Sequence, residues 1–86
     1  MQTETIATLI QAGLPDAKVT IDGDGTHFNA LVIAESFQGL SRLQRQQRVN
    51  DTVKTQLLDG SLHALSIKAC TPDEWQTLLA NSNKGT

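Results

Sequence analysis

Two histidines and one cysteine are the residues of this chain that could bind a metal through nitrogen or sulfur. His63 follows the turn-forming run Asp59-Gly60-Ser61 at the predicted start of a strand, and His27 stands where an earlier strand is expected to begin. A neutral imidazole at the end of a strand can offer one nitrogen to a metal ion. The commoner alternative is a histidine that is solvated or hydrogen-bonded to nearby backbone, so both roles stay open for each residue.

Cys70 is predicted to lie at the opposite end of the strand from His63. Seven residue steps of extended chain span roughly 23 Å, so His63 and Cys70 cannot bind the same metal ion. One cysteine cannot form an internal disulfide or build a multi-thiolate site alone. We therefore expect Cys70 to be a small buried apolar side chain, and we expect any metal that the chain binds to need ligands from a partner.

Basic residues gather in one segment of the chain. Arg42, Arg45, Arg48 and Lys54 are four of the seven lysines and arginines. On a helix, Arg45 and Arg48 project about 60° apart and can reach phosphates or base edges of DNA together with Gln44. The candidate nucleic-acid-binding residues are therefore Arg42, Gln44, Arg45 and Arg48. The alternatives are that the segment binds an acidic protein surface or that it is an ordinary solvated helix face. The net charge of −2 argues against binding nucleic acid through bulk charge.

The overall composition excludes several classes of protein. A chain of 86 residues forms one small domain with a thin core. The motifs of nucleophilic hydrolases, zinc proteases, P-loop proteins and dinucleotide-binding proteins are missing, so we expect no enzyme. No apolar run reaches the length of a membrane span, and the start Met1-Gln2-Thr3-Glu4 has no secretory character. We expect a cytoplasmic protein that does not bind membranes.

The hydrophobic periodicity predicts alternating helices and strands. Thr3 or Thr5 is the expected cap of the first helix, Asp22 to Thr26 form a turn, and Thr71 with Glu74 forms a capping box before Trp75. Strict alternation of apolar residues indicates strands, and spacings of three and four indicate helices. We expect helices at 4–11, at 44–58 after a short leading turn, and from 72 onward, and strands at 17–21, 28–34 and 62–70.

The order of these elements is α-β-β-(short α)-α-β-α. A helix crosses between the second and third strands, which favours parallel pairing of the third strand with its neighbour. The predicted fold is therefore α+β, with a three-stranded mixed sheet and helices packed on one face. Residues 1–80 are expected to form a single domain, and residues 81–86 are expected to form a flexible C-terminal tail.

Several residue runs resemble the BolA family. They are His27-Phe28, the run Phe37-Gln38-Gly39-Leu40-Ser41-Arg42 that continues to Asn50, Leu62-His63-Ala64-Leu65-Ser66-Ile67, and Thr71-Pro72-Asp73-Glu74-Trp75. The resemblance covers roughly residues 4–78. It is nearest to the bacterial branch called IbaG, because Gln46-Gln47-Arg48 stands where other members carry Arg-His-Arg. The resemblance implies a class II KH-like fold with the element order given above.

The resemblance also implies a function. BolA-like proteins partner a monothiol glutaredoxin, and the two proteins share a [2Fe–2S] cluster with glutathione, a role linked to cluster assembly, trafficking or sensing. The BolA-like protein supplies the histidine that matches His63 and a second ligand from the first strand loop, where His27 is the nitrogen donor present here. We expect the chain to bind no cluster alone and to be a monomer or weak homodimer.

The family is also associated with stress responses and transcriptional control. The alternative function is therefore a DNA-binding transcriptional regulator that uses the basic helix around Arg45 and Arg48.

Overall fold

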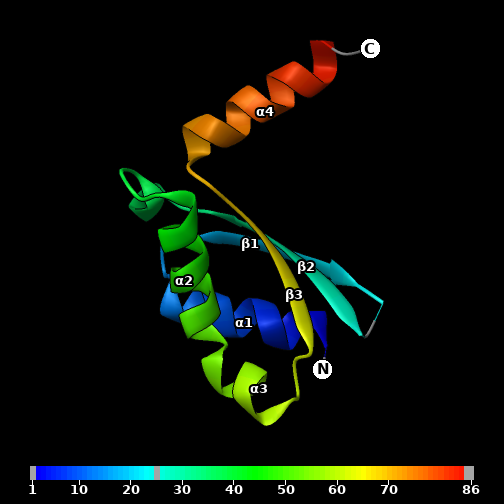
Figure 1. Cartoon of the computed structure of the whole chain (residues 1–86). Helices are drawn as coiled ribbons and strands as arrows, with labels where there is room; N and C mark the ends of the chain where they lie inside the picture. The colour runs from blue at the N-terminus through cyan, green and yellow to red at the C-terminus, as the bar shows by residue number, and fades with distance from the viewer. Residues whose placement is uncertain (1, 25, 85–86) are drawn as a thin grey trace.

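The computed structural model describes residues 2–24 and 26–84, which form four α-helices, three strands and one short 3-10 turn (Figure 1). The element order confirms the predicted one. In chain order the elements are α1 (Thr3–Gly13), β1 (Lys18–Gly23), β2 (His27–Ile33), η1 (Glu35–Phe37), α2 (Arg42–Thr52), α3 (Lys54–Asp59), β3 (Ala64–Cys70) and α4 (Pro72–Lys84). None of the described helices is long and apolar enough to cross a membrane.

The three strands form one mixed sheet in the order β1-β2-β3. β1 and β2 are antiparallel, with Lys18 opposite Ile33, whereas β2 and β3 are parallel, with His27 opposite Ala64. The parallel pairing needs a crossover, which α2 and α3 provide. The predicted α+β fold with a three-stranded mixed sheet is confirmed.

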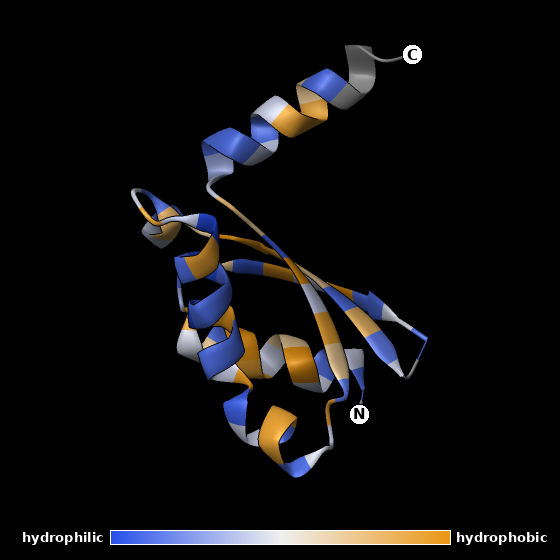
Figure 2. Ribbon diagram, viewed as in Figure 1, coloured by the Kyte–Doolittle hydropathy of each residue, from blue (hydrophilic) through white to orange (hydrophobic). Residues whose placement is uncertain are grey.

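One face of the sheet carries the hydrophobic core (Figures 1 and 2). Helices α1, α2 and α3 lie on this side of the sheet. Ile6 and Ile10 of α1 and Val49 of α2 are fully buried there. Alternation along β2 puts Phe28, Ala30 and Val32 in the core. The fully buried side chains with the largest volumes are Phe37, Ile6, Ile10, Leu62, Val32, Val49 and Val53. The opposite face of the sheet, called here the open face, presents exposed Thr20, Asn29, Ser66 and Lys68.

Helix α4 projects away from the rest of the molecule (Figure 1). The predicted capping box is present, because the Thr71 amide donates to Glu74 Oε1 at 2.9 Å and the Glu74 amide donates to Thr71 Oγ1 at 3.2 Å. Trp75 is only half-buried, and Leu79 is exposed. The helix continues to Lys84, beyond the expected end of the domain at residue 80, and residues 85–86 lie outside the described part of the chain. The flexibility of residues 81–86 stays a prediction.

The predicted helix 44–58 is divided at Val53 into α2 and α3. The Thr52 hydroxyl donates to the Val49 carbonyl at 2.6 Å, and the Val53 amide bonds to Asn50, three residues back, instead of to Val49. Side-chain hydroxyls that compete for a helix carbonyl favour such a break. The short turn is η1, several residues earlier than the leading turn that we expected.

Two smaller predictions are also wrong. The N-cap of α1 is Gln2, without a side-chain cap, because Thr3 already lies in the helix. β1 extends to Gly23, so the loop between β1 and β2 is shorter than expected. This loop is held by Asp24, whose Oδ1 accepts the amides of Thr26 and His27 at 2.9 Å each, while Gly25 lies outside the described residues.

Gly23 is required by the close packing at the end of this hairpin. A Cβ at position 23 would lie 2.4 Å from the His27 carbonyl oxygen and 2.7 Å from the Phe28 ring. We expect Gly23→Ala to destabilise the fold by about 1–3 kcal/mol through overpacking, measured by chemical denaturation. Thr20→Ala on the open face is the control and should stay within about 0.5 kcal/mol of the parent. Equal stability of the two variants would contradict this packing.

Candidate functional site

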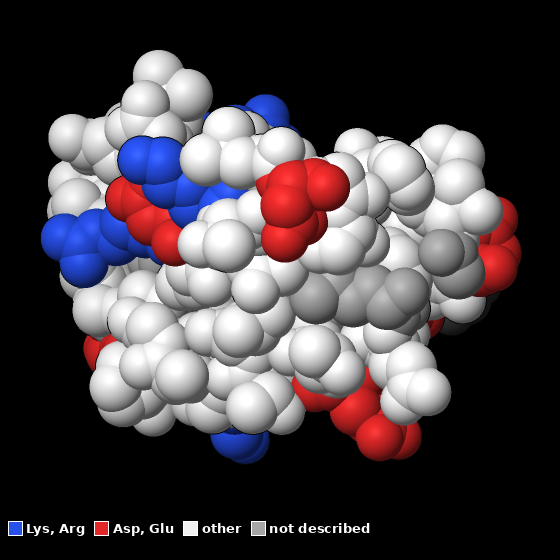
Figure 3. Space-filling view, turned by 90° about the horizontal axis from the view of Figure 1, so that it is seen from below, with Lys and Arg blue, Asp and Glu red and all other residues white. Residues whose placement is uncertain are grey.

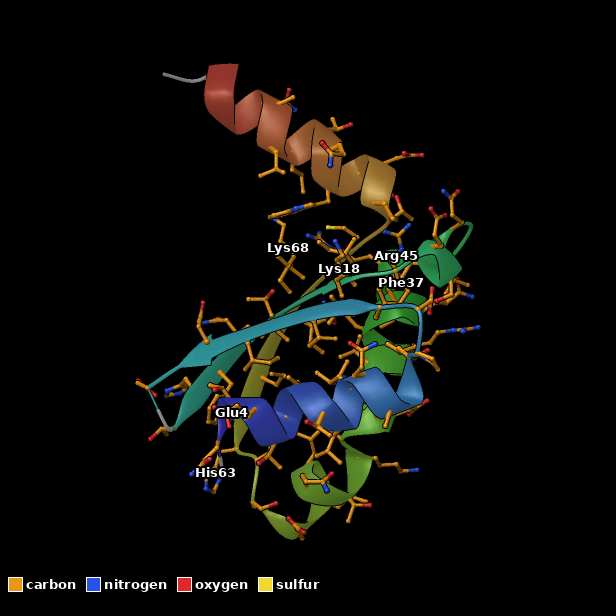
Figure 4. All side chains as sticks on the ribbon, turned by 180° about the vertical axis from the view of Figure 1, so that it is seen from behind. Glu4, Lys18, Phe37, Arg45, His63 and Lys68 are labelled. Atoms are coloured by element: carbon orange, nitrogen blue, oxygen red, sulfur yellow. The ribbon has the colours of Figure 1, made fainter. Side chains whose placement is uncertain are left out.

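His63 lies on the loop immediately before β3, at the end of the sheet where α1 begins (Figure 4). Its backbone is anchored on both sides. On one side, Leu62 is buried and its amide donates to the Gln56 carbonyl at 3.0 Å. On the other side, Ala64 starts the strand. The imidazole is exposed, and no residue that the structure describes hydrogen-bonds to it.

The turn before His63 is fixed by local bonds. Gly60 ends α3 with φ of +82°, a left-handed conformation that glycine adopts without strain, which confirms the predicted helix stop. Asp59 Oδ1 accepts the Ser61 hydroxyl at 2.7 Å and the Ser61 amide at 2.8 Å. These two bonds lower the pKa of the Asp59 carboxyl. His63 therefore extends from a well-defined turn.

His27 lies at the same end of the sheet. It is exposed, because alternation along β2 puts it on the face opposite buried Phe28, and it pairs with Ala64, the neighbour of His63. β2 and β3 are parallel neighbours about 4.8 Å apart, so the backbones of the two histidines lie close together at this end of the sheet. His27 is exposed on the open face of β2, and His63 is exposed on the loop one residue before Ala64.

The other donors near this end do not complete a metal site. Among the described residues there is no group of three or more His, Cys, Asp or Glu that could hold a metal ion. Asp24 is engaged by the amides of Thr26 and His27, and these bonds lower the pKa of its carboxyl. Cys70 is buried at the far end of β3, as expected. The chain thus presents imidazoles at one end of the sheet without a full ligand set.

Arg45, a predicted nucleic-acid contact, is turned into the molecule. Only 13% of its side chain is exposed, and its guanidinium forms a bidentate pair with Glu74, at 2.5 Å to Oε1 and 3.1 Å to Oε2. It also donates to the carbonyls of Leu40 at 3.1 Å and Ala69 at 3.3 Å, and it lies over the Phe37 ring. Sequence reasoning missed this pair, because the two residues are 29 positions apart and Glu74 already had a role as a cap.

The remaining predicted nucleic-acid contacts do not form one surface. Gln44 completes the cap of α2, since its Oε1 accepts the Ser41 amide at 2.8 Å. Arg42 and Arg48 are exposed, but at about 100° per residue they project about 120° apart around the helix. In the view of Figure 3, basic and acidic atoms are interspersed over a mostly uncharged surface. The structure therefore does not bring the four residues together.

The comparisons with known proteins agree on one class. The model of the BolA-like protein family matches residues 11–74. The acid stress protein IbaG of Escherichia coli strain K12 is 37% identical over 75 residues, which cover 87% of this chain and 89% of that protein. Two solved structures are also similar.

The bolA protein homologue from Coxiella burnetii has a TM-score of 0.78 and 35% identity, covering 88% of this chain and 97% of its own. The BolA domain of SufE1 from Arabidopsis thaliana has a TM-score of 0.72 and 30% identity, covering 84% of this chain and 93% of its own. Sheet order, helix arrangement and sequence together define a BolA-like α+β domain. The chain belongs to the BolA family, and it is similar to IbaG over most of its length.

The pair between Arg45 and Glu74 makes a testable contribution to stability. The Arg45 guanidinium, helped by the Thr71 amide, lowers the pKa of Glu74 from 4.5 to about 2. A carboxyl whose pKa is lower in the folded state stabilises the fold fully above its unfolded pKa. This contribution is lost as the pH falls through about 2. We expect Glu74→Gln to unfold at a lower temperature than the parent at pH 7 and at pH 4, and the gap to close only below about pH 3.

Thermal unfolding followed by circular dichroism measures this gap. Glu35→Gln is the matched control, because Glu35 is exposed and has no ion pair among the described residues. A gap that has already closed at pH 4 would contradict the depressed pKa of Glu74.

Proposed function

We propose that this protein is a BolA-like adaptor that partners a monothiol glutaredoxin and shares a [2Fe–2S] cluster with it. The observation that carries the proposal is the state of His63. It is exposed, held by an anchored backbone, and not hydrogen-bonded by any described residue, so a nitrogen is available to an external metal. Membership of the BolA family supports the same reading.

The two histidines of this chain could supply two of the four ligands of a [2Fe–2S] cluster. An iron–sulfur cluster needs four protein or small-molecule ligands, and no group of three donors exists among the residues described. His63 is the proposed first ligand. His27 is the proposed second ligand, because it pairs with Ala64, the residue next to His63. The glutaredoxin cysteine and glutathione would supply the remaining thiolates.

The chain's own residues have defined tasks in this proposal. Histidine ligands in place of thiolates raise the potential of a cluster. The turn at Ser61 and the buried Leu62 keep the His63 backbone in place, so the imidazole is offered without ordering a flexible loop. The bonds of Asp24 to Thr26 and His27 order the first strand loop in the same way. The protein acts here as a cytoplasmic binding partner and not as a catalyst.

Mixing the chain with a monothiol glutaredoxin, iron, sulfide and glutathione tests the proposal. We expect a visible circular dichroism spectrum that differs from that of the glutaredoxin homodimer. His63→Ala should abolish this mixed spectrum, and His27→Ala should weaken it. Lys54→Ala, an exposed change on α3, is the control and should leave it unchanged. A mixed spectrum that persists in His63→Ala would refute the ligand assignment.

A second variant separates ligation from mere folding. His63→Cys replaces the imidazole by a thiol at the same anchored position, so it should retain a mixed cluster with a lower reduction potential. Loss of the mixed complex in both His63→Cys and His63→Ala, with unchanged unfolding temperatures, would indicate that position 63 contacts the partner and not the cluster.

The alternative function is DNA binding through α2. Arg42 and Arg48 are exposed, but Arg45 is engaged with Glu74, so few cations remain for phosphates. We expect titration of a labelled DNA duplex at two salt concentrations to show no binding at low salt. The name of the relative IbaG, an acid stress protein, links that protein to stress without specifying DNA. Tight binding that weakens steeply with salt and is lost in Arg48→Glu would favour a regulator.

A further inference from the structure

β3 is an edge strand, and no other strand that the structure describes pairs with its outer side. The sheet order leaves β3 with β2 on one side only. The Ala34 amide donates to the Cys70 carbonyl at 2.9 Å, so the backbone groups of Cys70 point toward β2. Successive residues of a parallel strand alternate, which points the amides and carbonyls of Ile67 and Ala69 outward. The hydrogen bond from Arg45 of α2 to the Ala69 carbonyl confirms that this carbonyl points away from β2.

A groove runs along this outer edge. Its volume is about 620 Å³, which lies within the range of ligand-binding sites. Its floor is formed by four successive residues of β3, Ile67 to Cys70. Arg42 and Gln46 of α2 form one wall, and Glu74 and Leu78 of α4 contribute to the other. A groove between an edge strand and helices is the form in which proteins accept an extended peptide as an added strand.

The groove offers unused backbone partners. Among the described residues, Arg45 is the only group that bonds to the outer edge of β3, and it takes the Ala69 carbonyl. The amide and carbonyl of Ile67 and the amide of Ala69 remain available to a ligand. These groups suit a short segment, because Arg45 ends the open edge at Ala69.

The charges around the groove favour an acidic ligand. Glu74 is neutralised by Arg45, the only ion pair among the residues that the structure describes. Arg42 and Lys68 line the groove without such a partner, and Figure 4 shows Lys68 in the space between the sheet and α4. The rim is therefore positive, whereas Ile67, Ala69 and Leu78 provide apolar surface.

We propose that this groove, called here the edge groove, binds an extended acidic peptide segment of a partner protein as a fourth strand next to β3. Alternate side chains of the segment would face α2 with Arg42, and the others would face Lys68 and Leu78. An isolated acidic segment fits better than a second copy, because two copies paired at this edge would bring two positive rims together. The edge groove lies at the opposite end of β3 from His63, so the proposal does not rest on the cluster function.

Hydrogen exchange gives the most direct test. The probe is a short acetylated peptide of alternating glutamate and valine, added to the full chain. In the free protein, we expect the Ile67 and Ala69 amides to exchange fast and the Lys68 and Cys70 amides, which face β2, to be protected. Saturating peptide should slow exchange of Ile67 and Ala69 at least about tenfold. Binding that leaves these two amides unprotected would overturn strand addition.

Two peptide controls separate backbone pairing from charge. The same peptide with lysine for glutamate should not bind, and the acidic peptide with an N-methylated central residue should bind much more weakly, because it cannot donate to the edge. Equal binding of all three peptides would overturn the proposal. Protection of Ile67 and Ala69 that rises with protein concentration, without peptide, would show pairing of two copies and would also overturn it.

Charge-reversal variants locate the peptide. We expect Arg42→Glu and Lys68→Glu each to weaken binding about fivefold, the size of an exposed charge pair. Lys54→Glu on α3, outside the edge groove, is the matched control and should change affinity less than about twofold. The same weakening in the control variant would mean that only net charge matters, which contradicts the proposed site.

Discussion

The guanidinium of Arg45 connects more parts of this small protein than any other side chain. It binds the carbonyl of Leu40 before α2, the carbonyl of Ala69 in β3 and the carboxylate of Glu74 in α4, and it covers the ring of Phe37. Such charge-assisted bidentate pairs are stronger and more directional than neutral hydrogen bonds. The direction in which α4 leaves the sheet depends on this contact and on the capping box at Thr71. The same side chain occupies the Ala69 carbonyl, so the part of the outer edge of β3 that is open to a ligand ends at Ala69.

The internal bonds of Arg45 also explain why α2 presents fewer free cations than its composition suggests. The Nε, Nη1 and Nη2 atoms of Arg45 all donate hydrogen bonds within the protein, so Arg45 is a structural residue although it lies in a basic segment. Gln44 is similar, because its side chain caps the helix that contains it. Exposed basic residues remain at Arg42 and Arg48, on different sides of α2. The charge of the segment is thus divided between internal bonds and two separate surfaces.

Local sequence patterns predicted much of the fold for identifiable reasons. The capping box at Thr71, the helix stop at Gly60 and the alternation along β1 are short-range features, and each is confirmed. The break at Val53 was missed, because it depends on which group binds the Val49 carbonyl, and periodicity is insensitive to that choice. In the candidate site, too, the local features were predictable and the tertiary contacts were not. Exposure of His27 followed from alternation, whereas the pairing of Arg45 with Glu74 needed the tertiary structure.

The parallel pairing of β2 and β3 has a consequence for the order in which the elements of the protein fold. Each residue of β3 lies 37 positions after its partner in β2, whereas the hairpin of β1 and β2 closes over a few residues. Closing the longer segment costs more chain entropy, so the hairpin is expected to form first and β3 to dock later. Both His63 and the outer edge of β3 acquire their surroundings only in that late step. A nascent or partly unfolded chain therefore exposes neither surface in working form, so the proposed partners would bind only the completely folded protein.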